Sequence, residues 1–407
     1  MEALAERLGV GSRHLRRLFL KHLGATPTAV AHTRRLHFAK KLIDETNLPM
    51  SQVAIASGFG CVRRFNAAIQ KTYKRTPTRI RRLVRRAVSQ PENEYFFLLR
   101  FRAPYHWDGM LAFLAKRAIP GVEAVEQGTY RRSISFNGRH GYFEVSLAER
   151  MEALAVRIQF PDPCSLFFIV ERIRGMFDLG ADWVDIARTL KGDPLLAERV
   201  RSAPGLRVPG CWNGFELATR AIVGQLISVG SATAIAGRIA RKFGKPFAGV
   251  GKLTHLFPTP EVLANADLGT VGLTKARAET IRSLARAVCE GRIRFEGIVE
   301  TGAFLARLCE ISGIGAWTAQ YVAMRALGEP DAFPAGDLRL LRAMNLSSSR
   351  QLERRSEAWR PWRAYATMYL WNGFSESKIK GNKALGLETK RRPVKESVPA
   401  HVVSSIV

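Results

Sequence analysis

The chain has 407 residues, of which 46% are hydrophobic, and a formal net charge of +28 at pH 7. This length predicts two to three domains, and the hydrophobic fraction excludes a chain that is disordered throughout. The charge favours a polyanionic partner such as nucleic acid, because basic surfaces bind it with release of counterions, although ribosomal and membrane-surface proteins share this property.

Residues 1–88 are the most basic part of the chain, and they alternate helical patterns with turn signals, so no strand is expected there. Residues 4–19 predict a short helix, a glycine-centred turn with Ser12 as the next N-cap, and a basic second helix. Residues 51–65 repeat this pattern, and both copies lead into a Thr-Pro turn. This internal repeat resembles the AraC-type double helix-turn-helix domain.

That resemblance implies that the second helix of each unit enters the major groove of DNA. The side chains expected to face DNA are Arg13, Arg16 and Arg17 in the first unit and Arg63, Arg64 and Asn66 in the second. The alternative is a solvated basic face with no specific partner. The first unit begins at Met1 without the helix that usually precedes it, so it is either weakened or its natural start lies upstream.

Residues 94–200 are expected to form a mixed α/β domain with an antiparallel sheet. Asn137-Gly138 separates two strand-like segments, 131–136 and 140–147, and an Asn-Gly pair supplies the positive φ angles of a type I′ hairpin turn. Further strands are expected at 95–102 and 153–160, and helices near 107–118 and 165–177.

From 204 to 374 the pattern is helical throughout, with breaks at glycine and proline clusters, which predicts an all-helical domain. The uncharged stretch 221–237 is shorter than the ~20 residues that a membrane span needs, so we expect a buried helix of a soluble protein and no membrane partner. Residues 375–407 are basic with little periodicity, which predicts a disordered tail.

The five cysteines form no Cys-x-x-Cys pair and have no histidine at zinc spacing. This pattern argues against a structural metal and against a disulfide framework. Because the chain also starts without a secretion leader, we expect it in the cytoplasm, associated with the nucleoid.

The most specific motif is the run from Leu308 to Ala319, which is followed by Phe333-Pro334-Ala335-Gly336-Asp337. Two glycines around one apolar residue let a turn between helices expose its peptide N–H groups, and helix N-termini attract phosphate oxygens. Such a turn holds the DNA backbone without reading its sequence. The pattern resembles the helix-hairpin-helix DNA glycosylases, in which an aspartate downstream of the hairpin performs the chemistry.

The resemblance implies that Asp337 is catalytic and that the hairpin residues contact the DNA backbone, namely Gly313, Ile314, Gly315 and Thr318. Asp337 also stands where it can cap the helix that follows, and in this family it does both jobs. The carbonyls of Cys309, Ile311 and Ile314 match positions that hold a structural monovalent cation in the family's hairpin, and no other cofactor is expected.

Several blocks between about 101 and 374 resemble 3-methyladenine DNA glycosylase II, among them 104–107, 206–211, 220–229 and 359–366. The resemblance implies hydrolysis of the glycosidic bond of alkylated bases after base flipping. It places Leu226 as the wedge that fills the gap in the duplex, and it places four aromatic side chains in the base pocket: Phe113, Trp317, Tyr321 and Trp371. Ordinary core packing is the alternative for all five residues.

A cationic alkylpurine stacked on aromatic rings gains ~0.5–2 kcal/mol from cation–π attraction and a neutral base gains less, so the selectivity is expected to follow charge. Asp337 is expected to be ionised, and it either stabilises the sugar cation or orients water. The sequence departs from the family pattern at two positions, because Leu338 replaces a tyrosine and Gly109 replaces a tryptophan. An altered base preference is expected from these two replacements.

Glycosylases that also cut the strand place a lysine two residues after the second hairpin glycine, where this chain has Trp317. A monofunctional glycosylase without lyase activity is therefore expected. With its helix-turn-helix units, the layout resembles adaptive-response fusion proteins, but the cysteines of their methyl-accepting modules are absent from this sequence, so direct methyl transfer is not expected.

The expected partners are double-stranded DNA with alkylated bases, promoter DNA and RNA polymerase, and the protein is expected to be a monomer. The main rival hypothesis is a transcriptional regulator of the alkylation response whose glycosylase half is a non-catalytic sensor. A bifunctional glycosylase and lyase is the weaker rival.

Overall fold

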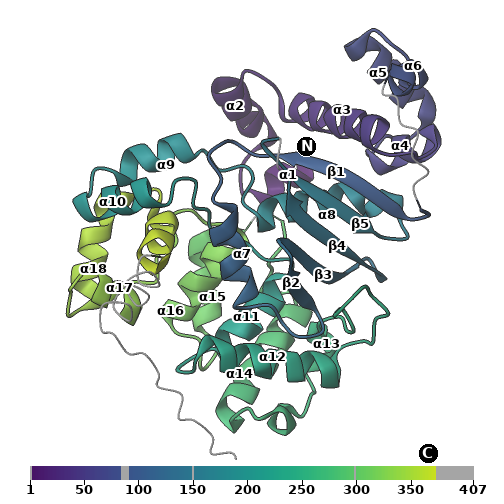
Figure 1. Cartoon of the computed structure of the whole chain (residues 1–407). Helices are drawn as coiled ribbons and strands as arrows, with labels where there is room; N and C mark the ends of the chain where they lie inside the picture. Colours follow the sequence, from purple (N-terminus) through teal and green to yellow (C-terminus); the bar gives the residue numbers. More distant parts are fainter. Residues whose placement is uncertain (1, 84–90, 149–150, 298, 373–407) are drawn as a thin grey trace, which may run out of the picture.

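The computed structural model describes residues 2–83, 91–148, 151–297 and 299–372. Helix-turn-helix units lie at one end, an antiparallel sheet lies next to them, and a larger group of helices completes the molecule (Figure 1). The expected fold class, mainly helical with a middle antiparallel sheet and a helical C-terminal part, is confirmed. The tail expected at 375–407 lies outside the described residues.

Two similar helix pairs, each followed by a further helix, make up the N-terminal part. Its helices are α1 (Glu2–Arg7), α2 (Ser12–Leu23), α3 (Pro27–Glu45), α4 (Met50–Ala56), α5 (Val62–Tyr73) and α6 (Pro77–Leu83). Gly24 and Lys74 end α2 and α5 in the left-handed conformation, with φ values of 64° and 55°. The prediction that Ser12 caps α2 is wrong, because the extended N-cap residue is Gly11 and Ser12 is already the first helical residue.

The sheet has five strands in the order β1-β5-β4-β3-β2, and every neighbouring pair is antiparallel. The strands are β1 (Glu94–Arg100), β2 (Glu123–Glu126), β3 (Thr129–Phe136), β4 (Arg139–Leu147) and β5 (Ala153–Gln159). Asn137 and Gly138 both have positive φ, 49° and 73°, which confirms the predicted hairpin. The sequence did not predict β2, whose four residues are half glutamate.

Helices pack on the sheet and join it to the helix-turn-helix units. They are α7 (Trp107–Ala115), η1 (Pro163–Ser165) and α8 (Leu166–Met176). Phe38 of α3 meets Phe167 of α8 edge to face, with ring centroids 5.1 Å apart. At the edge strand β1, the Lys41 ammonium donates to the Leu98 carbonyl at 2.6 Å, and the Leu98 N–H donates to Glu45 at 3.2 Å. These side chains occupy backbone groups that an open sheet edge would otherwise expose.

The remaining helices are α9 (Trp183–Leu190), α10 (Pro194–Ser202), α11 (Gly214–Val223), α12 (Val229–Phe243), α13 (Pro260–Leu263), η2 (Leu268–Val271), α14 (Lys275–Cys289), α15 (Thr301–Cys309), α16 (Ala316–Val322), η3 (Ala323–Leu327), α17 (Leu338–Ala343), α18 (Ser349–Ser356) and η4 (Glu357–Trp359). A last helical segment spans 363–372. The apolar faces of α9 and α10 belong to the same buried cluster as those of the later helices. No helix in the described ranges is long and apolar enough to cross a membrane.

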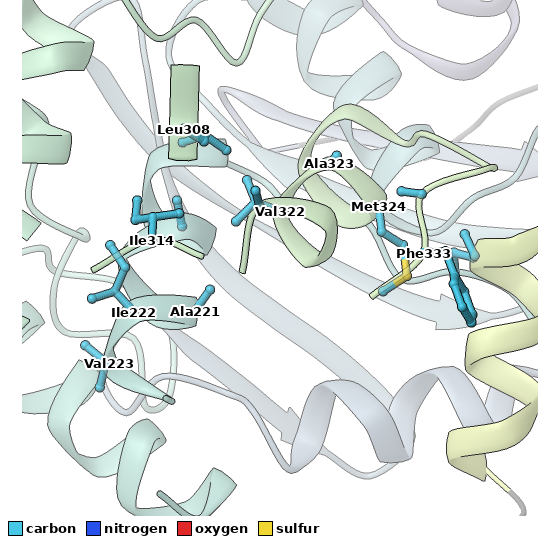
Figure 2. Packing of buried hydrophobic residues seen from close by; sticks show 14 of the residues in the cluster. Ala221, Ile222, Val223, Leu308, Ile314, Val322, Ala323, Met324 and Phe333 are labelled. Carbon is cyan, nitrogen blue, oxygen red and sulfur yellow. The ribbon is translucent and has the colours of Figure 1, made fainter. Parts of the chain in front are cut away.

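The centre of this part is a packed core that fixes the hairpin between α15 and α16. Figure 2 shows Ile222 of α11 close to Ile314 of the hairpin, with Leu308 of α15 and Val322 of α16 beside them. The η3 segment that follows α16 is a π-helix, a form that often marks functional sites. The prediction of one buried helix over 221–237 is wrong, because α11 ends at Val223 and α12 begins at Val229.

A buried charge network ties the sheet to α11. Arg132 on β3 pairs with Glu216 of α11 at 2.5 Å and with Glu123 of β2 at 3.3 Å, and Arg220 of α11 also pairs with Glu123, at 3.1 Å. Burial costs ions their hydration, so each of these charges needs its partners. The network fixes α11, which carries one wall of the site described next, against the sheet.

Candidate active site

Asp337 is the N-cap of α17 and is only 9% exposed. One carboxylate oxygen, Oδ1, accepts the backbone N–H groups of Arg339 at 2.9 Å and Leu340 at 3.1 Å and the Trp371 indole N–H at 3.2 Å. The other oxygen, Oδ2, accepts the Trp317 indole N–H at 3.0 Å. Four N–H donors hold the negative charge in one orientation. Because Oδ2 has a single partner, it keeps a lone pair for a ligand.

The carboxylate lies at a cavity of about 580 Å³. Trp317 and Tyr321, one turn apart on α16, are stacked with centroids 5.4 Å apart and planes 5° apart, and Trp371 lies 6.2 Å from Tyr321. All four aromatic residues predicted for the base pocket line this cavity together with Asp337. The structure therefore brings side chains from α7, α16 and segment 363–372 to one place.

Arginines that sequence reasoning missed also line the cavity. Arg325, buried in η3, donates to the Tyr321 hydroxyl at 2.7 Å and to the carbonyls of Pro209 and Gly210 at 2.7 and 2.9 Å. Burial alone would raise the pKa of Tyr321, but Arg325 and Arg117 outweigh it, so the pKa is lowered. The spacing in the sequence could have revealed these arginines. Arg117 follows Phe113 by one helical turn, and Arg325 follows Tyr321 by the same interval.

Phe113 already contacts two cations of the protein itself. The guanidinium carbon of Arg117 lies 3.7 Å from the centroid of its ring, and that of Arg325 lies 4.9 Å away. These are cation–π distances. Phe113 thus lies at the cavity as predicted, but its ring is engaged by arginines and is not a free face for a base.

Leu226 projects from the loop between α11 and α12 and is 99% exposed, so core packing does not account for it. Its φ of 59° is unusual for a residue with a side chain, and such conformations cluster at functional positions. The preceding Gln225 donates to the Gly313 carbonyl at 2.9 Å and to the Thr318 hydroxyl at 3.0 Å, and its own carbonyl accepts from Arg277. An exposed apolar side chain therefore stands on a loop that is fastened to the hairpin.

The hairpin turn has the conformation that its glycines allow. Gly313 has a φ of 91°, and a Cβ there would meet the Thr280 hydroxyl at 2.2 Å. Gly315 is exposed and is the N-cap of α16, so the first N–H groups of that helix have no acceptor within the helix. Ile314 is buried, and so is Thr318, whose hydroxyl is used by Gln225. The side chain of Thr318 is therefore already engaged within the protein.

The three carbonyls expected to hold a cation flank this turn. The Ile311 carbonyl accepts the Ile314 N–H at 2.9 Å, which leaves it one lone pair. Within the described ranges, no backbone hydrogen bond reaches the carbonyls of Cys309 and Ile314. Uncommitted carbonyl oxygens of this kind fit a hard monovalent cation.

The predicted DNA-facing residues of the helix-turn-helix units are all exposed: Arg13, Arg16, Arg17, Arg63, Arg64 and Asn66. Leu15 in α2 and Phe65 in α5 are buried and anchor their helices, which leaves the basic faces of both helices in solvent. These faces are therefore available to a polyanion.

Three family models match the chain in order. Residues 4–83 match a helix-turn-helix domain, 96–213 the AlkA N-terminal domain, and 219–363 the HhH-GPD superfamily base excision DNA repair protein. The chain is 37% identical over 380 residues to the probable bifunctional transcriptional activator/DNA repair enzyme AlkA of Mycobacterium tuberculosis, which covers 91% of this chain and 76% of the relative.

Two further comparisons concern the part after the helix-turn-helix units. DNA-3-methyladenine glycosylase 2 of Escherichia coli is 32% identical over 281 residues, which are 68% of this chain and 96% of that protein. The solved 3-methyladenine DNA-glycosylase from Archaeoglobus fulgidus has a TM-score of 0.58 at 23% identity, and the match covers 67% of this chain and 96% of that chain. This last comparison shows a shared fold.

Proposed function

The chain belongs to the AlkA family of DNA repair enzymes and carries a helix-turn-helix domain before its glycosylase part, and on this premise we propose that Asp337 performs the excision of alkylated bases from DNA. The glycosylase breaks the N-glycosidic bond of a flipped base, and the additional domain binds DNA. The observation that carries the proposal for Asp337 is its position, since an oriented carboxylate lines an aromatic cavity.

The first step is extrusion of the damaged nucleotide, which costs a few kcal/mol of stacking and pairing. Leu226 offsets part of this cost, because an exposed apolar side chain can fill the gap that the base leaves. The backbone N–H groups at the start of α16 hold a phosphate of the same strand. A monovalent cation bound by the carbonyls of Cys309, Ile311 and Ile314 would add positive charge beside that phosphate.

The chemistry then takes place between the base and its sugar. As the bond to the base breaks, positive charge develops on the sugar, and the fixed carboxylate of Asp337 stabilises it. Oδ2, which has one N–H partner, is also free to orient the water that adds at C1′. The two indoles of Trp317 and Trp371 keep the carboxylate from turning away when the sugar arrives.

The enzyme is a hydrolase without lyase activity, because the position of a lyase lysine is occupied by Trp317. Its indole N–H is bound to Asp337 and supplies no amine nucleophile. Among the residues that line the cavity, the lysine is Lys116. It is exposed to solvent and follows α7, far in the sequence from the position that Trp317 occupies.

The helix-turn-helix units bind a promoter through the basic faces of α2 and α5 and bring RNA polymerase to it, with the protein acting as a monomer at the nucleoid. This second role is supported by the exposed basic faces of α2 and α5, which occupy equivalent positions in the two helix-turn-helix units. If excision is absent, the glycosylase half serves this regulation as a sensor of DNA damage.

The test is release of 3-methyladenine from methylated duplex DNA by the purified protein and by Asp337→Asn. We expect release by the wild type and at least a thousandfold loss in the variant, with binding of abasic duplex retained. Asn keeps the Oδ1 cap of α17, so a folded variant is expected. Equal loss of binding and excision would contradict the assigned role, and a folded wild type that releases no base would favour the sensor.

A further inference from the structure

Arg117 lies at the base cavity with most of its hydrogen-bonding capacity unused. Its guanidinium stacks on Phe113 and donates one bond, to the Phe113 carbonyl at 3.2 Å. A guanidinium has five N–H donors. In the part of the chain that the structure describes, Arg117 forms no ion pair with a carboxylate. Its remaining donors are therefore available to a group inside the cavity.

The other arginines of the cavity wall are differently placed. Arg220 is paired with Glu123 at 3.1 Å, and Arg325 donates to Tyr321 and to two carbonyls. Arg339 is exposed at the start of α17. Arg117 is thus the guanidinium that combines burial at the cavity with free donors.

The part of the cavity wall around Arg117, which lies beside Arg325 and Arg220, is electrostatically unfavourable for a further cation, whereas the Asp337 carboxylate lines another part of the same wall. Burial, together with the charges of Arg325, Arg220 and Arg339, lowers the pKa of Arg117 to about 10. Arg117 therefore remains charged at neutral pH, but in surroundings that disfavour its charge. A cationic base placed beside it would add to the same repulsion, and the ring of Phe113 is already engaged.

We propose that Arg117 is a specificity-determining residue that favours an uncharged 6-oxopurine over a cationic alkylpurine. Two N–H groups of an arginine fit O6 and N7 of such a base side by side, which is the commonest specific contact of arginine with a purine. A purine methylated at N7 loses one of the two acceptors and gains a positive charge, so both effects act against it. This inference rests on the proposed glycosylase function, and it is opposite to the selectivity expected from the aromatic rings alone.

The experiment compares single-turnover excision from two duplexes, one with hypoxanthine opposite thymine and one with 7-methylguanine opposite cytosine. Hypoxanthine is the uncharged probe with free O6 and N7. For Arg117→Gln we expect excision of hypoxanthine to fall at least tenfold and excision of 7-methylguanine to rise severalfold. Arg188→Gln, which removes an exposed arginine of α9 outside the cavity, is expected to leave the ratio of the two rates unchanged.

A second variant separates charge from geometry. Arg117→Lys keeps the positive charge but loses the planar pair of donors. It is expected to lose excision of hypoxanthine while the rate with 7-methylguanine stays at or below that of the wild type. An equal fall of both rates in each variant, or an unchanged ratio, would overturn the inference and leave Arg117 a structural residue. A wild type that releases neither base would instead overturn the proposed function, and the inference with it.

Discussion

The side-chain amide of Gln225 donates to the carbonyl of Gly313 at 2.9 Å. The two residues are far apart in the sequence, but this bond joins the loop that carries Leu226 to the hairpin that we propose to hold the DNA backbone. The same amide also reaches the buried hydroxyl of Thr318. The loop and the hairpin are therefore fastened to each other, and under the proposed function a phosphate held by the hairpin sets the place where Leu226 enters the duplex.

Gln225→Ala is expected to reduce excision from fully paired duplex about tenfold, because the loop that positions Leu226 loses its fastening to the hairpin. The effect is expected to be smaller on a duplex in which the damaged base has no partner, since less unpairing is needed there. Single-turnover rates on the two duplexes measure this difference. Gln351→Ala, on the exposed side of α18, is the matched control. An equal loss on both duplexes would show that Gln225 acts on a later step than extrusion.

Asp178 is expected to make the stability of the protein depend on pH. It lies among buried residues and accepts a hydrogen bond from the Tyr365 hydroxyl at 2.8 Å. Burial raises its pKa to about 6, although Tyr365, Arg207 and the Val208 N–H each lower the pKa. A carboxyl group whose pKa is higher in the folded than in the unfolded protein contributes stability at low pH. This contribution is fully present below the unfolded pKa near 4 and is lost as the pH rises through about 6.

The comparison with Asp178→Asn isolates that contribution. As the pH rises from 4 to 7, the variant should gain free energy of unfolding relative to the wild type, by at most about 3 kcal/mol for two pKa units. Denaturant unfolding of both proteins across this range gives the difference. Because Asp178 has a positive φ of 51°, which asparagine tolerates, backbone strain does not confound the result. A difference that is constant with pH would show that Asp178 does not titrate in this window.

Local patterns predicted the parts of the site that lie close together in the sequence. Trp317 and Tyr321 are one helical turn apart, and the glycines of the hairpin require a conformation that other residues avoid, so both features can be read directly. Asn137-Gly138 was equally readable, because its turn type depends on two residues only.

The parts that sequence reasoning missed depend on tertiary contacts. In a sequence, a buried arginine cannot be told from a surface arginine. Only the fold shows that the carbonyls of Pro209 and Gly210 accept hydrogen bonds from the Arg325 guanidinium. The apolar run around Leu226 resembled a core helix, and the bond from Gln225 to the hairpin, far along the chain, is what fastens it as a loop. The strand β2 has too few apolar residues to show an alternating pattern.

Strand cleavage is expected to be absent, because no amine stands where a lyase lysine is required. Duplex DNA with an abasic site, incubated with the protein and borohydride, should give no covalent adduct, and strands should break only after alkali. If an adduct does form, Lys116→Ala identifies its origin, since Lys116 is the lysine on the cavity wall. An adduct that disappears in this variant would show a lyase that uses a different lysine position from the one that Trp317 replaces.

Arg63→Ala with Arg64→Ala is expected to weaken binding to intact duplex DNA while leaving excision unchanged. Both side chains are exposed on α5 and form no ion pair among the described residues, so their loss removes charge and not structure. Each phosphate contact that is lost should reduce the slope of log K against log salt by about 0.9. Arg188→Ala with Arg201→Ala removes two exposed charges from α9 and α10 and should leave that slope unchanged. A parallel loss of excision in the first variant would mean that α5 and the base cavity hold the same duplex, so that the helix-turn-helix units would belong to the repair enzyme itself.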